Sequence, residues 1–159
     1  MSRTYLNYID GQWMPALDGA TTTDKNPANT EGVVGVFALA GRADAARAIE
    51  ATAKAFPVWA KMPMLKRGEV LHRAAALFEA RADEIAEALT REEGKTLAES
   101  KGEALRGAMI LRFFAGETMQ PTGEVYPSAS AGTFLYAERV PLGVVALITP
   151  WNFPVAIPT

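Results

Sequence analysis

A short, unbroken apolar run near the end of the chain most constrains the fold. Residues Val144 to Ile148 read Val-Val-Ala-Leu-Ile, and Thr149-Pro-Trp-Asn-Phe-Pro154 follows directly. The run is too short to cross a membrane and is rich in β-branched residues, which is typical of a strand buried on both faces of a parallel sheet. Two prolines restrict the backbone of the turn after it, and Pro154 suits the first turn of a helix. The sequence therefore predicts an α/β fold, in which ligands bind at the carboxyl end of such a strand.

Composition narrows the class of protein. The chain has 159 residues, enough for one compact domain, with 49% hydrophobic residues, 21% charged residues and a net charge of −2. This charge balance gives no electrostatic basis for binding nucleic acid or an anionic membrane. No segment approaches the ~20 apolar residues of a membrane span, and the start, Met1 to Tyr8, lacks the apolar core of a signal peptide. We therefore expect a cytoplasmic protein.

The chain contains no cysteine and a single histidine, His72. Disulfides, thiolate metal sites and thiol nucleophiles are therefore excluded within these residues. One histidine cannot make a histidine-based triad or a multi-histidine metal site. We expect no metal site of that kind.

The first half of the chain predicts small strands followed by helices. Tyr5 to Trp13 predicts a hairpin that turns at Asp10-Gly11, residues 15–31 predict a loop, and Val33 to Leu39 predicts a strand. Residues 41–56 carry apolar side chains at helical spacing, and Pro57 is expected to end that helix. A second helical pattern runs through Leu89, with a bend expected near Asp83.

The second half predicts a long helix and a ribbon. Gly94 is placed as a left-handed helix terminator, with Glu92 to Lys95 as a helix end with solvated charges. Thr96 and Glu99 form a capping box for a helix over residues 97–119, whose predicted inward stripe includes Leu105, Met109 and Phe113. Residues 121–132 predict a loop or the open end of a long hairpin, and residues 133–140 alternate as a strand.

Six segments in fixed order carry a family resemblance: Tyr8-Ile-Asp-Gly-Gln-Trp13, Asn26-Pro-Ala28, Trp59 with Lys66-Arg67, Glu92-Glu-Gly-Lys95, Phe114-Ala-Gly-Glu117, and the stretch from Pro141 to Pro154. Together they resemble the amino-terminal part of the NAD(P)-dependent aldehyde dehydrogenase family. The resemblance implies that the nucleophilic cysteine, the glutamate base and the glycine-rich phosphate turn lie after Thr159.

The resemblance also implies a domain plan. Residues 1–120 would be the amino-terminal hairpin and the helical part of the cofactor-binding domain. Residues 121–141 would be the oligomerisation ribbon, which implies a homo-oligomer, either dimer or tetramer. Residues 142–159 would be the first strand and turn of an incomplete Rossmann-like parallel sheet.

Asn152 is the predicted catalytic residue. By resemblance, its side-chain amide donates to the oxyanion that forms when a thiolate attacks the aldehyde. A neutral donor held by a stiff turn stabilises developing charge without supplying a proton. The alternative is that Asn152 caps a helix starting near Pro154.

The residues beside Asn152 are assigned by the same resemblance. Ile148, Thr149, Pro150 and Trp151 match the strand end that contacts NAD or NADP in the family, largely through the backbone. Phe153 matches the wall of the substrate tunnel. The alternative for Trp151 is a core aromatic, and the alternative for Phe153 is ordinary core packing.

Arg106 shares a helix face with Met109, Ile110 and Phe113. A cationic side chain in an apolar stripe either extends its charged end into solvent while its aliphatic part stays among the apolar residues, or it pairs with an acidic side chain. By resemblance the helix passes the substrate entrance, so Arg106 could also receive a substrate carboxylate, which would make the substrate a semialdehyde acid. Binding of an alkali cation near residues 92–95 is left open.

The expected function is the NAD(P)-dependent oxidation of an aldehyde to a carboxylic acid by the complete enzyme. The 159 residues alone, without a thiol, are expected to be inactive. The alternative is a catalytically inactive module that only folds and associates through its ribbon.

Overall fold

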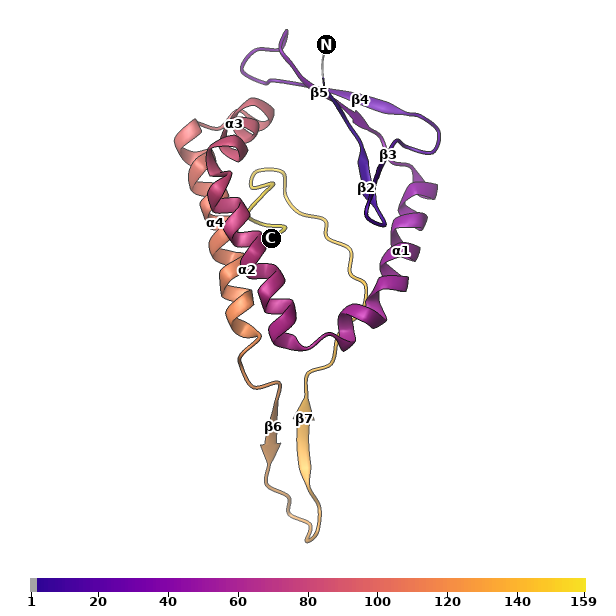
Figure 1. Ribbon diagram of the computed structural model, residues 1–159, viewed down its shortest axis with the longest axis vertical. Helices are drawn as coiled ribbons and strands as arrows, with labels where there is room; N and C mark the ends of the chain where they lie inside the picture. The colour runs from indigo at the N-terminus through magenta and orange to yellow at the C-terminus, as the bar shows by residue number, and fades with distance from the viewer. Residues whose placement is uncertain (1–2) are drawn as a thin grey trace.

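The computed structural model describes residues 3–159 and combines small sheets with long helices (Figure 1). Strands gather at one end, the helices form the middle, and a two-stranded ribbon projects from the other end. The elements are β1 (Thr4–Tyr5), β2 (Asn7–Ile9), β3 (Gln12–Met14), β4 (Thr21–Lys25), β5 (Val33–Ala38), α1 (Arg42–Lys61), α2 (Met64–Ala80), α3 (Ala82–Glu93), α4 (Leu97–Glu117), β6 (Gly123–Tyr126) and β7 (Leu135–Glu138).

The amino-terminal strands confirm the predicted hairpin. β2 and β3 pair antiparallel, and the turn between them places Asp10 and Gly11 at φ 53° and 75°. Positive φ at both central residues is what an Asp-Gly hairpin turn requires. The predicted loop over residues 15–31 is wrong in part, because β4 lies within it. Its threonines pair antiparallel with β5, while β1 pairs parallel with the other edge of β5.

The first helix is longer than the sequence predicts. α1 continues through Pro57 to Lys61, so the expected end at Pro57 is wrong. A proline inside a helix removes one backbone hydrogen bond, and the helix tolerates that loss here. Asp44 lies buried near the helix start, where its carboxylate accepts hydrogen bonds from the N–H groups of Gly41 and Leu17.

The core lies between α2 and α4. Ala75, Ala108 and Leu111 are buried together, with Leu71, Ala74 and Phe78 packed around them. Gly107 lets the Phe78 ring approach closely, since a Cβ at this position would lie 3.1 Å from Phe78 Cε1. The small residues of α4 thus set how near the two helices come.

The predicted inward stripe of α4 is wrong. Leu105, Met109 and Phe113 are exposed. The buried face of α4 instead consists of Ser100, Glu103, Ala104, Gly107, Ala108, Leu111 and Ala115. Small side chains allow close backbone approach, and this packing outweighs the hydrophobicity of the larger residues on the next face.

The helix boundaries around residues 81–97 follow the local signals. A break at Arg81 separates α2 from α3, close to the bend expected near Asp83. Gly94 ends α3 in the left-handed conformation, with φ 89°. Thr96 and Glu99 form the predicted capping box at the start of α4. These predictions are confirmed.

The ribbon consists of β6 and β7, paired antiparallel from Gly123–Glu138 to Tyr126–Leu135. Every residue of both strands is exposed. Figure 1 shows the ribbon standing clear of the helices.

The last segment departs from the prediction. Residues Val144 to Ile148 form no strand and are all exposed, so the buried strand expected here is wrong for this chain. A strand needs a neighbour for its backbone groups, and none of the strands in residues 3–159 pairs with this run. The helix expected at Pro154 is wrong too, because residues 154–158 form turns. None of the helices in residues 3–159 has the length and apolar character needed to cross a membrane.

Candidate functional site

A cavity of about 460 Å³ lies between the start of α4 and the turn after the apolar run. It brings together three residues singled out from the sequence, namely Asn152, Phe153 and Arg106. The complete lining is Lys95, Glu99, Gly102, Glu103, Arg106, Asn152 and Phe153. In Figure 1 the end of the chain, in yellow, folds back against α4.

Asn152 is held by its backbone. Its carbonyl oxygen accepts a hydrogen bond of 3.0 Å from Lys95 Nζ. Within residues 3–159, its carboxamide has no hydrogen-bond partner and remains free to act as a donor. The alternative helix-cap role is not realised, because no helix begins at Pro154.

A buried ion cluster supports this turn. Glu103 has a side chain that is 1% exposed and pairs with Lys95, whose side chain is 13% exposed. Lys95 Nζ also lies 3.0 Å from a carboxylate oxygen of Glu93. The interpretation of Glu92 to Lys95 as solvated charges is therefore wrong for Glu93 and Lys95.

Glu103 also binds the backbone beyond Asn152. Its Oε1 accepts hydrogen bonds from the N–H groups of Val155 at 2.8 Å and Ala156 at 3.1 Å. Burial alone would raise the pKa of Glu103, but the hydrogen bonds from Lys95 and the two backbone groups outweigh it and lower the pKa. Glu103 is therefore an anion around neutral pH.

The pKa of Lys95 moves the opposite way. Burial alone would lower it, but the hydrogen bond to Glu103, the close contact with Glu93 and the charges of both carboxylates raise the pKa of Lys95. The ammonium also lies 4.5 Å from the centroid of the Phe153 ring, within the range of a cation–π contact. Phe153 is half exposed, so it is a wall of the cavity rather than a core residue.

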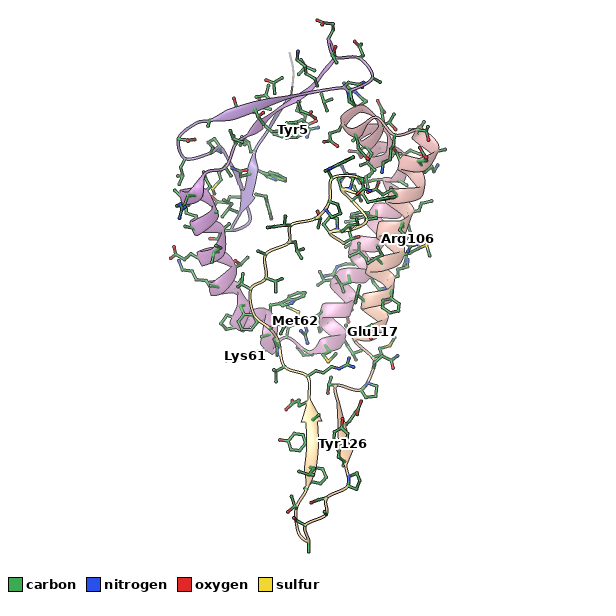
Figure 2. The ribbon with its side chains drawn as sticks, turned by 180° about the vertical axis from the view of Figure 1, so that it is seen from behind. Tyr5, Lys61, Met62, Arg106, Glu117 and Tyr126 are labelled. Carbon is green, nitrogen blue, oxygen red and sulfur yellow. The ribbon has the colours of Figure 1, made fainter. Side chains whose placement is uncertain are left out.

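Arg106 contributes a second cation to the cavity. Figure 2 labels it on α4, where its side chain is exposed. No acidic side chain among residues 3–159 forms an ion pair with it. Of the explanations offered from sequence, the structural ion pair is wrong, and solvation and ligand binding remain.

The predicted cofactor residues lie outside the cavity. Ile148 is 99% exposed and Trp151 is 82% exposed, so the core interpretation of Trp151 is wrong. Within the part of the chain described, no hydrogen bond uses the backbone groups of Ile148, Thr149, Pro150 or Trp151. This stretch offers an apolar surface and free backbone donors and acceptors.

Lys95 and Glu103 were not predicted as site residues. They meet the turn across 57 and 52 positions of sequence respectively. The available signal was a glutamate on the small-residue face of α4, next to Ala104 and Gly107, where an unpaired charge would be costly.

The comparisons with known proteins agree with this architecture. A sequence model described as "Aldehyde dehydrogenase family" matches residues 13–159. The chain is 46% identical over 155 residues to alpha-ketoglutaric semialdehyde dehydrogenase of Bacillus subtilis, covering 98% of this chain and 32% of that protein. The chain belongs to the aldehyde dehydrogenase family.

Solved structures show the same fold. A crystal structure of an aldehyde dehydrogenase from Brucella melitensis biovar abortus 2308 aligns with a TM-score of 0.91 at 39% identity, covering 95% of this chain and 32% of that one. A crystal structure of an NAD-dependent aldehyde dehydrogenase from Sinorhizobium meliloti aligns with a TM-score of 0.93 at 31% identity. The alignment covers 99% of this chain and 32% of that one. The chain thus spans about a third of the length of the relatives it matches.

Proposed function

We propose that the protein to which this chain contributes is an NAD(P)-dependent aldehyde dehydrogenase that oxidises a semialdehyde acid to a dicarboxylic acid. The observation that carries the proposal is the cavity where Asn152, Phe153 and the unpaired Arg106 meet. The similarity to a semialdehyde dehydrogenase over nearly the whole chain supports the same substrate class.

Asn152 would act on the oxygen of the aldehyde. A thiolate from outside these cysteine-free residues adds to the carbonyl carbon, and the electron pair moves to the carbonyl oxygen. The free carboxamide of Asn152 would donate a hydrogen bond to this oxyanion. Hydride loss then gives a thioester, and water releases the acid and the thiol.

The cofactor is expected to bind along Ile148 to Trp151. When bound, NAD or NADP supplies the hydride acceptor. The free backbone groups of this stretch fit the polar edges of a ribose and a carboxamide, and the exposed side chains of Ile148 and Trp151 fit an apolar ring face. These residues would orient the ring toward the Asn152 turn.

Arg106 would select the substrate. A guanidinium with no acidic partner in the described chain can bind a carboxylate through two parallel hydrogen bonds. Its position in the cavity that Asn152 also lines would let one substrate carry an aldehyde at one end and a carboxylate at the other.

The test compares Arg106→Ala and Asn152→Ala in the full-length protein, with a semialdehyde acid and a neutral aldehyde of equal length. We expect Arg106→Ala to raise KM for the acidic aldehyde by at least tenfold and to leave KM for the neutral one nearly unchanged. We expect Asn152→Ala to lower kcat by about 10²–10³ for both. Equal effects of Arg106→Ala on the two aldehydes would contradict the substrate class.

A second candidate function is a folding and association module that is inactive by itself. The exposed ribbon of β6 and β7, with bulky side chains on both faces, favours this role for the 159 residues. The two functions are compatible, because an enzyme that assembles through the ribbon would use both. Homo-oligomer formation and a cytoplasmic location stay predictions. An assay of the 159 residues with NAD and aldehydes should give no turnover.

A further inference from the structure

We infer that Glu103 and Lys95 are positioning residues that hold the Asn152 turn in its reactive geometry. The inference rests on the proposed function, since it concerns how the proposed oxyanion donor is kept in place. Neither side chain needs to touch the substrate for this role. They act through the carbonyl group of Asn152 itself and through the N–H groups of Val155 and Ala156 after it.

Both oxygens of the Glu103 carboxylate have partners in the structure. Oε1 accepts from the N–H groups of Val155 and Ala156, and Oε2 pairs with Lys95. The side chain projects from α4, which packs on α2 and α3. The carboxylate therefore fixes the chain after Asn152 to the most tightly packed part of the molecule.

Lys95 fixes the turn at Asn152 itself. Lys95 Nζ donates hydrogen bonds to Glu103 and to the carbonyl of Asn152, and it forms an ion pair with Glu93. A carbonyl held at 3.0 Å restricts the peptide plane from which the Asn152 side chain extends. The same ammonium lies over the Phe153 ring, so one cation orients both the oxyanion donor and the cavity wall.

These contacts matter because the chain leading into the turn has little other support. Residues 140–150 form neither helix nor strand, and the backbone of Ile148 to Trp151 has no hydrogen-bond partner in the described chain. Within residues 3–159, the ion cluster is thus the main polar anchor of the Asn152 turn. A misplacement of about 1 Å can cost about 10² in rate, so loss of the anchor should appear in kcat rather than only in stability.

The experiment is a double-mutant cycle in the full-length protein, assayed with the semialdehyde acid of the proposed function. The variants are Glu103→Ala, Asn152→Ala and both together, with Glu84→Ala as the control. Glu84 also pairs with a cation, Arg81, but on the exposed surface. Hydrogen exchange of a peptide covering residues 151–157 provides a readout that does not depend on turnover.

We expect Glu103→Ala to lower kcat by about 10², with a smaller effect on KM, and to speed exchange in residues 151–157. Asn152→Ala should cost about 10²–10³ in the parent and less than about tenfold in the Glu103→Ala background, because the donor is already displaced. Glu84→Ala should change neither quantity. If Glu103→Ala does not fold, Lys95→Met tests the same anchor while keeping the apolar stem.

The outcomes separate the inference from the function on which it rests. If Asn152→Ala costs the same in both backgrounds, or if exchange is unchanged in Glu103→Ala, the positioning role is wrong. If Asn152→Ala leaves kcat unchanged in the parent while Glu103→Ala speeds exchange, the anchor stands and the oxyanion role of Asn152 is wrong.

Discussion

The Leu17 N–H donates a hydrogen bond of 3.0 Å to the Asp44 carboxylate across 27 positions of sequence. The other oxygen of Asp44 accepts from the Gly41 N–H at 2.9 Å. One buried side chain thus starts α1 and ties the strand-rich amino-terminal region to it.

Asp44→Ala should therefore destabilise the chain by about 1–3 kcal/mol, since two N–H groups lose a charged acceptor. The measurement is urea unfolding of the 159-residue chain. Glu50→Ala is the matched control, because Glu50 lies on the same helix in an exposed pair with Lys54 and should change stability by less than about 0.5 kcal/mol. Equal midpoints for the two variants would contradict the role of Asp44.

Gly94→Ala should be destabilising by about 1–2 kcal/mol because a non-glycine residue resists positive φ. The new Cβ would also lie 2.9 Å from Pro27 Cγ. Gly102→Ala is the matched control: Gly102 lies within α4, and an alanine methyl there would meet no heavy atom within 4 Å outside its own helix turn. Alanine at Gly102 should stabilise by up to about 1 kcal/mol. In thermal unfolding, Gly94→Ala should lower the midpoint temperature and Gly102→Ala should raise it. A shift of both midpoints in the same direction would contradict this interpretation of Gly94.

The ion cluster of Lys95, Glu93 and Glu103 predicts that the stability of the folded chain depends on pH. The folded pKa of Glu103 lies below its ordinary value of 4.5, so its contribution to stability is complete above about pH 4.5 and is lost as pH falls through the folded pKa. The pKa of Lys95 lies above its ordinary 10.5, so its contribution is complete below that pH and is lost as pH rises through the folded value.

The check is the free energy of unfolding of the parent minus that of Glu103→Gln, followed from pH 7 to pH 3. The difference should be largest near neutral pH and should shrink in the acid range. Glu84→Gln, which alters an exposed pair, should give a small difference throughout. If the difference in free energy of unfolding between the parent and Glu103→Gln grew toward pH 3, the change would have the wrong sign for a carboxylate with a lowered pKa.

The ribbon predicts association. Val125 on β6 is 68% exposed, and Phe134 and Tyr136 near it are exposed as well, which is typical of a surface that another subunit covers. Val125→Glu should lower the molar mass of the full-length protein measured by light scattering. Val58→Glu, at an exposed valine of α1, should leave the mass unchanged. No change with Val125→Glu would argue against association through β6.

The parts of the fold that sequence predicts well are those set by neighbouring residues. The turn at Asp10-Gly11, the helix stop at Gly94 and the capping box at Thr96 each depend on the conformation of a few consecutive residues, and the structure contains all three. The end of α1 was misplaced because Pro57 costs one hydrogen bond, which the remaining helix outweighs.

The parts that sequence predicts poorly depend on distant partners. Val144 to Ile148 has the composition of a buried strand, but composition cannot supply the adjacent strand that would pair with it. Asn152, Phe153 and Arg106 were placed near one cavity by family resemblance, and the structure brings them together. Glu103 was missed, because a glutamate within a helix gives no sign that the N–H groups it binds are 52 and 53 residues away.

Glu103 binds N–H groups that lie 52 and 53 residues later in the chain, so these contacts can form only late in synthesis. Synthesis proceeds from the amino terminus, and helices can pack before later segments emerge. α4 is complete at Glu117, well before Val155 and Ala156 exist to bind the carboxylate. Until they leave the ribosome, the ion pair with Lys95 is the contact of Glu103 in the described chain that uses residues already synthesised.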